Sequence, residues 1–132
     1  MTEIGRMDDR ELYERGLKVR REVLGAQYVD KAVAGADEFN RHWQEYVTKH
    51  CWGAVWTRPG LDRRTRSMLN LAMLGAMGRG NELKLHLRGA ITNGVTKDEI
   101  AEIFLQVGAY AGAPCALEAF KVAKEVFDEL KL

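Results

Sequence analysis

The sequence predicts an all-α protein, a single-domain bundle of about six helices spanning residues 1–132. Along the second half of the chain, apolar residues recur three and four positions apart, the spacing that places them on one face of a helix. Capping signals divide the chain into segments of helical length. No segment shows the alternation of apolar and polar residues that is typical of a half-buried strand, so a sheet is not expected.

The first half of the chain is expected to begin with two helical stretches. Asp8 or Asp9 can cap a charged first helix, which Gly25 ends. The second stretch covers residues 29–50, with a possible break near Gly35.

A loop is predicted next, over residues 51–61, because Pro59 and Gly60 interrupt helical structure there. The following helix covers residues 63–77, and its second half, MLNLAMLGAM, is apolar on nearly all sides. A helix of this kind is buried all round. In so small a domain, full burial points to a subunit interface.

The remaining helices have clear boundary signals. One covers residues 81–94, and its apolar face comprises Leu83, Leu87, Ala90 and Ile91. Thr96 and Glu99 have the spacing of a capping box for the next helix. Residues 110–113 form a break of small residues, after which Pro114 can occupy the first turn of the last helix.

Composition excludes several classes of function. The net charge of +1 lacks the basic excess of a nucleic-acid-binding protein. No apolar run is long enough to cross a bilayer, and the charged N-terminus lacks the apolar segment of a signal peptide, so we expect a cytoplasmic protein. Cys51 and Cys115 form no metal-binding pattern, and we expect neither a metal nor a cofactor.

Glu82 and His86 are the best candidates for catalysis. They are four residues apart on one predicted helix and therefore share a face. A carboxylate beside an imidazole can fix its tautomer and raise its pKa, which makes a general acid or base at neutral pH. The alternative is an exposed pair that adds only a few tenths of a kcal/mol to helix stability.

A second group of candidates suits an anionic, planar small molecule. Trp52 and Trp56 in the predicted loop can supply aromatic walls, and Arg58 can bind a carboxylate through two hydrogen bonds. The alternative is that the tryptophans cover an edge of the core. A cluster of arginines, Arg63, Arg64 and Arg66, begins a helix, where cations oppose the helix dipole. An anionic ligand or a partner's carboxylates would explain them, and the alternative is a solvated run of charge.

Two blocks of the chain resemble the carboxymuconolactone decarboxylase family: HCWGAVWTRPGLDRRTRSMLNLAML and ELKLHLRGAITNGVTKDEIAEIFLQVGAYAGAP. The resemblance covers residues 10–128. It implies an alkylhydroperoxidase-like fold that assembles as a homotrimer or homohexamer. It also implies cofactor-free decarboxylation of 4-carboxymuconolactone to the β-ketoadipate enol-lactone, in the breakdown of protocatechuate.

Redox proteins of the wider superfamily carry a CxxC motif before the equivalent histidine and a glutamate one helix earlier. The corresponding positions here are Arg79, Glu82 and Ser67, so the resemblance implies no dithiol chemistry.

The implied substrate is a lactone dicarboxylate that serves as its own electron sink, since loss of CO2 sends two electrons into the lactone carbonyl. His86, oriented by Glu82, is expected to donate a hydrogen bond or a proton to the developing enolate. The expected substrate-binding residues are Arg58, Trp52, Trp56, Arg63, Arg66, Arg88 and Tyr110.

Three alternatives remain open at this point. The chain could be a redox protein that uses Cys51 or Cys115, a non-catalytic helical oligomer that binds small aromatic acids, or a related lactone hydrolase or isomerase.

Overall fold

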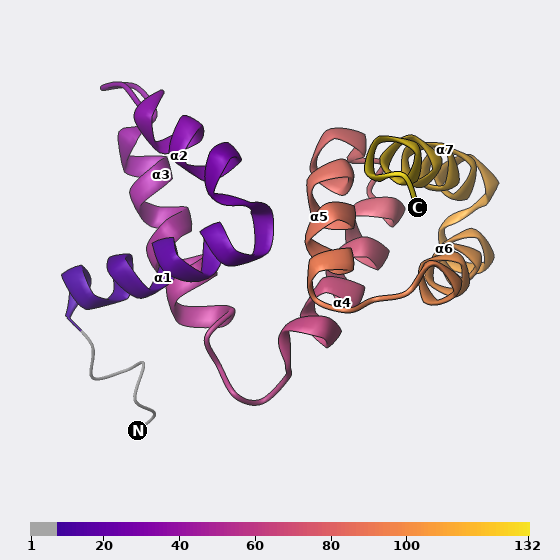
Figure 1. Ribbon diagram of the computed structural model, residues 1–132, viewed down its shortest axis with the longest axis horizontal. Helices are drawn as coiled ribbons and strands as arrows, with labels where there is room; N and C mark the ends of the chain where they lie inside the picture. The colour runs from indigo at the N-terminus through magenta and orange to yellow at the C-terminus, as the bar shows by residue number, and fades with distance from the viewer. Residues whose placement is uncertain (1–7) are drawn as a thin grey trace. The chain divides into compact units, whose positions relative to one another are not determined.

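The computed structural model describes residues 8–132. Within them the regular secondary structure is helical, and there is no strand (Figure 1). The all-α expectation is therefore confirmed for these residues. The chain divides at Asp62 into two compact units, and each is described by itself.

The first unit contains four helical segments: α1 (Asp9–Leu24), α2 (Ala26–Ala34), α3 (Arg41–Tyr46) and the π-helix η2 (Val47–Val55). The boundaries expected for α1 are confirmed. The Asp8 side chain accepts a hydrogen bond from the Glu11 backbone N–H at 2.8 Å, and Gly25 ends the helix with φ 95°. A positive φ is costly for residues other than glycine, which explains the residue at this sharp turn.

The loop predicted over residues 51–61 is wrong in its first half. Helix η2 continues through Val55, so Cys51 and Trp52 are helical, and irregular structure begins only after Trp56. Trp52 and Trp56 are 3% and 5% exposed and pack in a core cluster with residues of α1. Burying two large aromatic side chains outweighs the local preference for a loop.

The contact between α1 and η2 depends on two glycines. A Cβ on Gly16 would overlap the carbonyl oxygen of Thr48 and lie 2.8 Å from the backbone nitrogen of Gly53. A Cβ on Gly53 would overlap the carbonyl oxygen of Leu12. The two backbones therefore touch at their crossing, and only hydrogen fits at either position.

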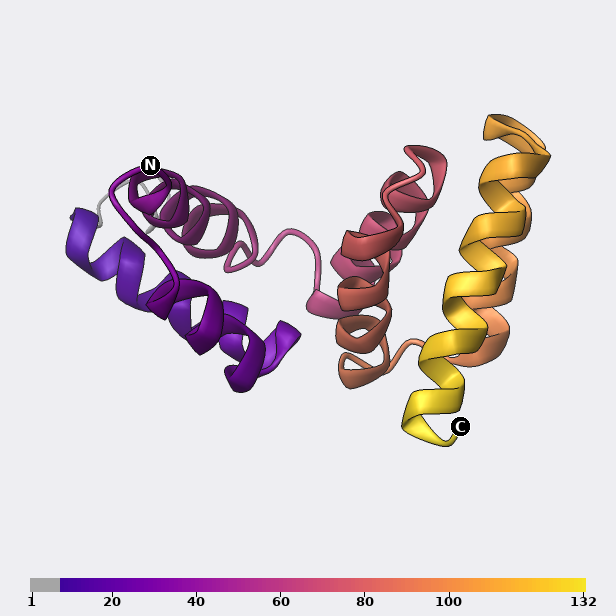
Figure 2. The same cartoon turned by 90° about the horizontal axis from the view of Figure 1, so that it is seen from above.

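The second unit contains four helices: α4 (Arg63–Ala76), α5 (Gly80–Thr92), α6 (Lys97–Ala111) and α7 (Ala113–Leu130). Helix α4 packs against α5 and α6, while α7 packs against α5 and α6 (Figure 2). The predicted apolar face of α5 is confirmed, because Leu83, Leu87 and Ala90 are at most 1% exposed. These residues form the main core with Leu71 of α4 and Phe104 of α6.

Most boundaries of this unit follow the sequence signals. Thr96 and Glu99 form the expected capping box, with hydrogen bonds of 2.9 and 3.1 Å. Pro114 lies in the first turn of α7, as expected. The break expected over residues 110–113 is narrower, because α6 continues to Ala111 and only Gly112, with φ 108°, separates it from α7.

Within a single chain, α4 is buried on one face only, and the full burial expected from a subunit interface stays a prediction. One face, which includes Leu71 and Gly75, is buried in the core of the second unit. Leu69, Met73 and Met77 are 46%, 53% and 64% exposed, and they recur four residues apart along another face. We call these three residues the α4 stripe. Within residues 8–132, no helix is both long and apolar enough to cross a membrane.

We predict that Gly16→Ala destabilises the protein by about 3 kcal/mol, because the added methyl group must push two helix backbones apart. Urea unfolding monitored by circular dichroism measures the change. Gly60→Ala is the matched control, since a Cβ there meets nothing within 4 Å, and we expect a change within about 0.5 kcal/mol. Equal stability of the two variants would contradict the close helix crossing.

Candidate functional site

His86 lies on α5, where it faces α4 and is largely shielded from solvent. Its Nδ1 is 3.3 Å from Nδ2 of Asn70, which lies on α4. Asn70 was not among the residues expected from the sequence. The signal that could have found it is a single polar residue within the apolar run MLNLAML.

Burial lowers the pKa of His86 to about 4, because an imidazolium ion loses hydration when it is shielded from water. The expectation that Glu82 raises this pKa is therefore wrong. Glu82 is 48% exposed in its side chain and pairs instead with Arg79, at 3.5 Å. At neutral pH, His86 is an uncharged imidazole that can donate one hydrogen bond.

Two arginines share a face of α4 with Asn70. Arg63, Arg66 and Asn70 follow one another at spacings of three and four residues, which places them along one side of the helix. Both arginines are partly buried. This face of α4 therefore carries two arginines on the same side of the helix as Asn70, an arrangement that suits an anionic ligand.

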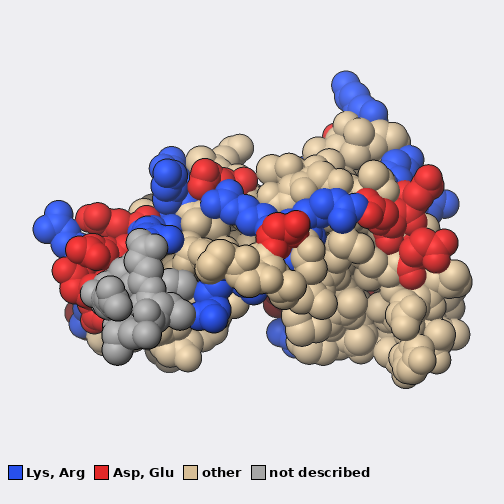
Figure 3. Space-filling model, turned by 90° about the horizontal axis from the view of Figure 1, so that it is seen from below, with Lys and Arg blue, Asp and Glu red and all other residues tan. Residues whose placement is uncertain are grey.

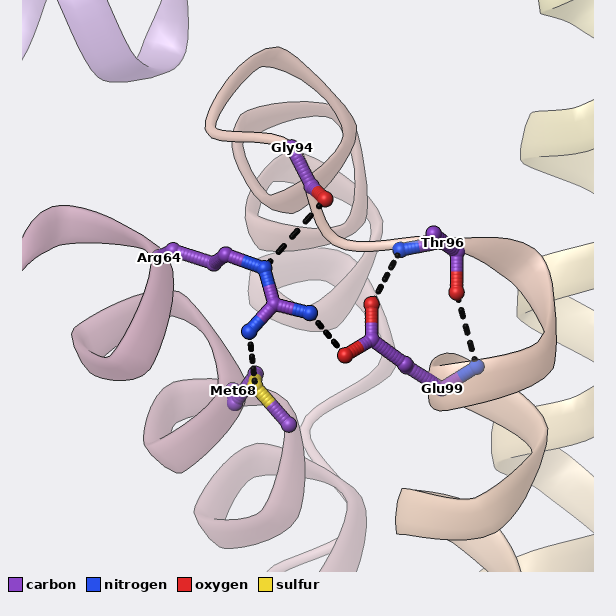
Figure 4. A network of polar contacts seen from close by, with 5 residues as sticks. All are labelled: Arg64, Met68, Gly94, Thr96 and Glu99. Carbon is purple, nitrogen blue, oxygen red and sulfur yellow. Dashed lines mark hydrogen bonds and ion pairs between the residues drawn. The ribbon is translucent and has the colours of Figure 1, made fainter.

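Three basic residues of this unit, Arg64, Lys84 and Arg88, form ion pairs with carboxylates of α6 and α7. Arg88 pairs with Glu129 of α7, which also pairs with Lys84 at 2.9 Å. Arg64 pairs with Glu99 and donates to the Gly94 carbonyl at 3.4 Å (Figure 4). Arg64 thus joins the start of α4 to the capping box of α6.

Two expected site residues are not brought to His86. Arg88 is two residues from His86 and pairs with Glu129 of α7, and its expected role in substrate binding stays a prediction. Tyr110 is 86% exposed near the end of α6.

The tryptophans of the first unit are core residues. The rings of Trp52 and Trp56 are stacked, with centroids 4.8 Å apart and planes at 20°. Trp52 lies in a helix and not in the expected loop, whereas the role of the two rings as walls of a substrate site stays a prediction. Arg58 is exposed after η2, and its backbone N–H donates to the Val55 carbonyl at 3.1 Å.

A cavity of about 410 Å³ lies between α4 and α6, but its chemistry does not suit an anion. Met68, Ala72 and Ile103 give it an apolar lining, whereas Asp98, Glu99 and Glu102 add carboxylates. These carboxylates would repel an anionic substrate, and His86 is not part of the lining. We therefore place the candidate site on the face of α4 that carries Asn70.

Cys51 lacks the features of a reactive thiol. Burial raises the pKa of the Cys51 thiol, and the nearby charge of Arg20 only partly offsets this effect. Cys115 is free, and its Sγ donates to the Ala76 carbonyl at 3.4 Å. Among residues 8–132, no three His, Cys, Asp or Glu side chains are grouped to hold a metal ion.

Charge is mixed on the face of the molecule shown in Figure 3. Lys and Arg side chains lie among Asp and Glu side chains and form no continuous basic stripe.

The class of protein follows from the helical fold and from comparison with known families. The model of the carboxymuconolactone decarboxylase family matches residues 41–125, and this chain belongs to that family. The match extends across both units of the structure.

Individual relatives are also decarboxylases by name. The chain is 45% identical to 4-carboxymuconolactone decarboxylase of Acinetobacter baylyi over 124 residues, which cover 94% of this chain and 92% of the relative. It is 45% identical to nitrosuccinic acid decarboxylase npaB of Metarhizium robertsii over 121 residues, covering 92% and 85% of the two chains. A 47-residue match at 40% identity to 4-carboxymuconolactone decarboxylase of Pseudomonas putida covers 36% of this chain and 98% of the relative.

We predict that His86 makes the protein lose stability as the pH falls from about 6.5 to about 4. Between these pH values His86 is protonated in the unfolded chain but stays neutral in the folded protein, so the free energy of unfolding decreases as the pH falls. Urea unfolding at pH 7 and pH 4.5 measures the loss. We expect His86→Gln to lose about 2 kcal/mol less than the wild type between these two pH values. Equal losses would contradict the lowered pKa.

Proposed function

We propose that this chain catalyses the cofactor-free decarboxylation of 4-carboxymuconolactone to the β-ketoadipate enol-lactone in protocatechuate catabolism. The observation that carries the proposal is the 45% identity to a 4-carboxymuconolactone decarboxylase over nearly the whole of both chains. The arrangement of Arg63, Arg66 and His86 supports it, because an anionic substrate and a developing oxyanion need these two kinds of group.

The reaction can proceed without a cofactor because the lactone accepts the electrons. The bond between the ring γ-carbon and its carboxylate breaks, and CO2 leaves. The electron pair passes through the ring alkene to the lactone carbonyl and forms a dienolate. A proton from a water molecule then adds to the α-carbon, which gives the enol-lactone and leaves hydroxide, which bulk solvent neutralises.

The principal task of the protein is to stabilise the dienolate oxygen. Neutral His86 can donate a hydrogen bond to this oxygen, an interaction that strengthens as negative charge develops. Because the pKa of His86 is about 4, the residue acts in this proposal as a neutral hydrogen-bond donor and not as a general acid. Arg63 and Arg66 hold the carboxylates, and partial burial of the site favours release of neutral CO2 over retention of the anion.

We predict that His86→Ala lowers kcat by about 10²- to 10³-fold, the usual effect of removing one oxyanion donor. Arg66→Ala should raise KM by at least about tenfold, through loss of a charge-assisted bond to a carboxylate. CO2 release from 4-carboxymuconolactone with a metal chelator present measures both effects.

Matched controls separate these roles from general damage. His42→Ala removes an exposed imidazole of the first unit and Arg10→Ala an exposed guanidinium, and both should behave as the wild type. A folded His86→Ala protein with near-normal kcat would exclude the proposed role of His86. Full activity of Cys51→Ser/Cys115→Ser is expected, whereas its loss would favour a thiol-dependent redox protein.

A second candidate substrate is nitrosuccinate, which the name of the fungal relative at 45% identity suggests. In both substrates, one carbon carries the departing carboxylate, a CH2COO⁻ arm and an electron sink, which is the nitro group in nitrosuccinate. A higher kcat/KM for nitrosuccinate than for the lactone in the same CO2 assay would make it the preferred assignment.

We also propose that the chain assembles as a homotrimer or homohexamer. The exposed α4 stripe supports this, because three large apolar side chains in one row are commonly covered by a partner. A second copy of the chain is the partner that the family resemblance implies.

We predict that Met73→Glu, in the middle of the α4 stripe, shifts the mass measured by sedimentation equilibrium toward the 14.9 kDa of one chain. A buried carboxylate without a partner opposes association. Gln27→Glu, which adds the same charge at an exposed position of α2, should keep the wild-type mass. An unchanged mass for Met73→Glu would place the subunit interface elsewhere.

A further inference from the structure

We propose that Asn70 is a positioning residue that holds His86 as the tautomer protonated on Nε2. The inference rests on the proposed function for the identity of the acceptor, which would be the oxyanion of the substrate. The tautomer itself is a property of the free protein and can be measured without any substrate.

The hydrogen-bonding capacity of the two groups determines the direction of the contact. The atom of Asn70 nearest His86 is Nδ2, at 3.3 Å from Nδ1. An amide nitrogen can donate hydrogen bonds but cannot accept them. With the amide in this orientation Nδ1 accepts, and we infer that the single proton of a neutral imidazole resides on Nε2.

A second polar contact between α4 and α5 helps to fix the position of the Asn70 side chain relative to His86. One turn before Asn70 on α4, Ser67 is fully buried, and its Oγ accepts a hydrogen bond of 2.9 Å from Nδ2 of Asn93, at the end of α5. Two polar contacts between the same two helices restrict sliding and rotation of one helix along the other. Leu71 and Leu87, adjacent to the His86 pair in sequence, are 0% exposed and add to this restraint.

An amide has a different effect from the carboxylate that commonly orients histidine. A carboxylate accepts a hydrogen bond from Nδ1 and favours the imidazolium ion. Asn70 carries no charge, and Glu82 is engaged by Arg79. The amide therefore orients a neutral ring whose proton is on Nε2. Such a donor can stabilise an oxyanion without transferring its proton.

Nitrogen NMR of protein labelled with ¹⁵N in its three histidines tests the proposal directly. The His86 signals are assigned by their loss in His86→Gln. At pH 7 we expect Nδ1 of His86 to be unprotonated and Nε2 to carry the proton. In Asn70→Asp, the carboxylate should place a proton on Nδ1. A wild-type protein with the proton on Nδ1 would overturn the proposal, whatever its activity.

Kinetics separate positioning from a structural role. We expect Asn70→Asp to lower kcat on the order of 10²-fold with little change in KM, since the donor is altered but the arginines remain. Asn81→Asp is the matched control, because it makes the same change at an exposed position of α5, outside the Asn70–His86 and Ser67–Asn93 contacts. It should keep the wild-type tautomer and nearly the wild-type kcat. Equal losses of kcat in the two variants, with the His86 tautomer unchanged, would overturn the positioning role.

Discussion

The packing of α5 against α4 is the constraint on which the candidate site depends. Leu83 and Leu87 of α5 are buried in the same core as Leu71 of α4. Once these side chains are in place, the helical repeat leaves His86 facing Asn70. The apolar contacts supply the stabilisation, and the polar contact beside them selects one rotation of the histidine ring. The contact between α4 and α5 therefore both buries the core leucines and brings Asn70 to His86.

The neutral state of His86 agrees with chemistry in which the substrate provides the electron sink. A charged imidazole would need a carboxylate partner or water to stabilise it, and the α4–α5 contact supplies an amide instead. Catalysis by a fixed hydrogen-bond donor requires little rearrangement as negative charge develops. The same logic covers a lactone enolate and a nitronate, because both place the new charge on an oxygen atom. It therefore accommodates both relatives, whose names give different substrates.

The second unit leaves a considerable part of its apolar surface uncovered. The sequence analysis correctly identified α4 as too apolar for an ordinary surface helix, and the α4 stripe shows which face is concerned. Contact of these apolar side chains with water is unfavourable, and association with a partner would remove this contact and stabilise the complex. In the first unit, Gly16 and Gly53 allow the backbones of α1 and η2 to touch, and this close packing helps to bury Trp52.

The sequence by itself determined the helical class, the family and most helix ends. Asp8, Gly25, the Thr96–Glu99 capping box and Pro114 act through hydrogen bonds and backbone angles within a few residues, so their effects can be read locally. The apolar face of α5 was predictable for the same reason, because periodicity is a local property.

Only the tertiary structure decided what the candidate site residues contact. Glu82 and His86 share a helix face by spacing, yet the α4–α5 contact buries the imidazole while Arg79 pairs with the exposed carboxylate. Long-range burial likewise extended η2 through Trp52, against the local loop signal. The partner of His86, Asn70, lies sixteen residues away on another helix. Helix spacing specifies which residues of one helix lie together, whereas burial and pairing depend on the neighbouring helix, which packing alone supplies.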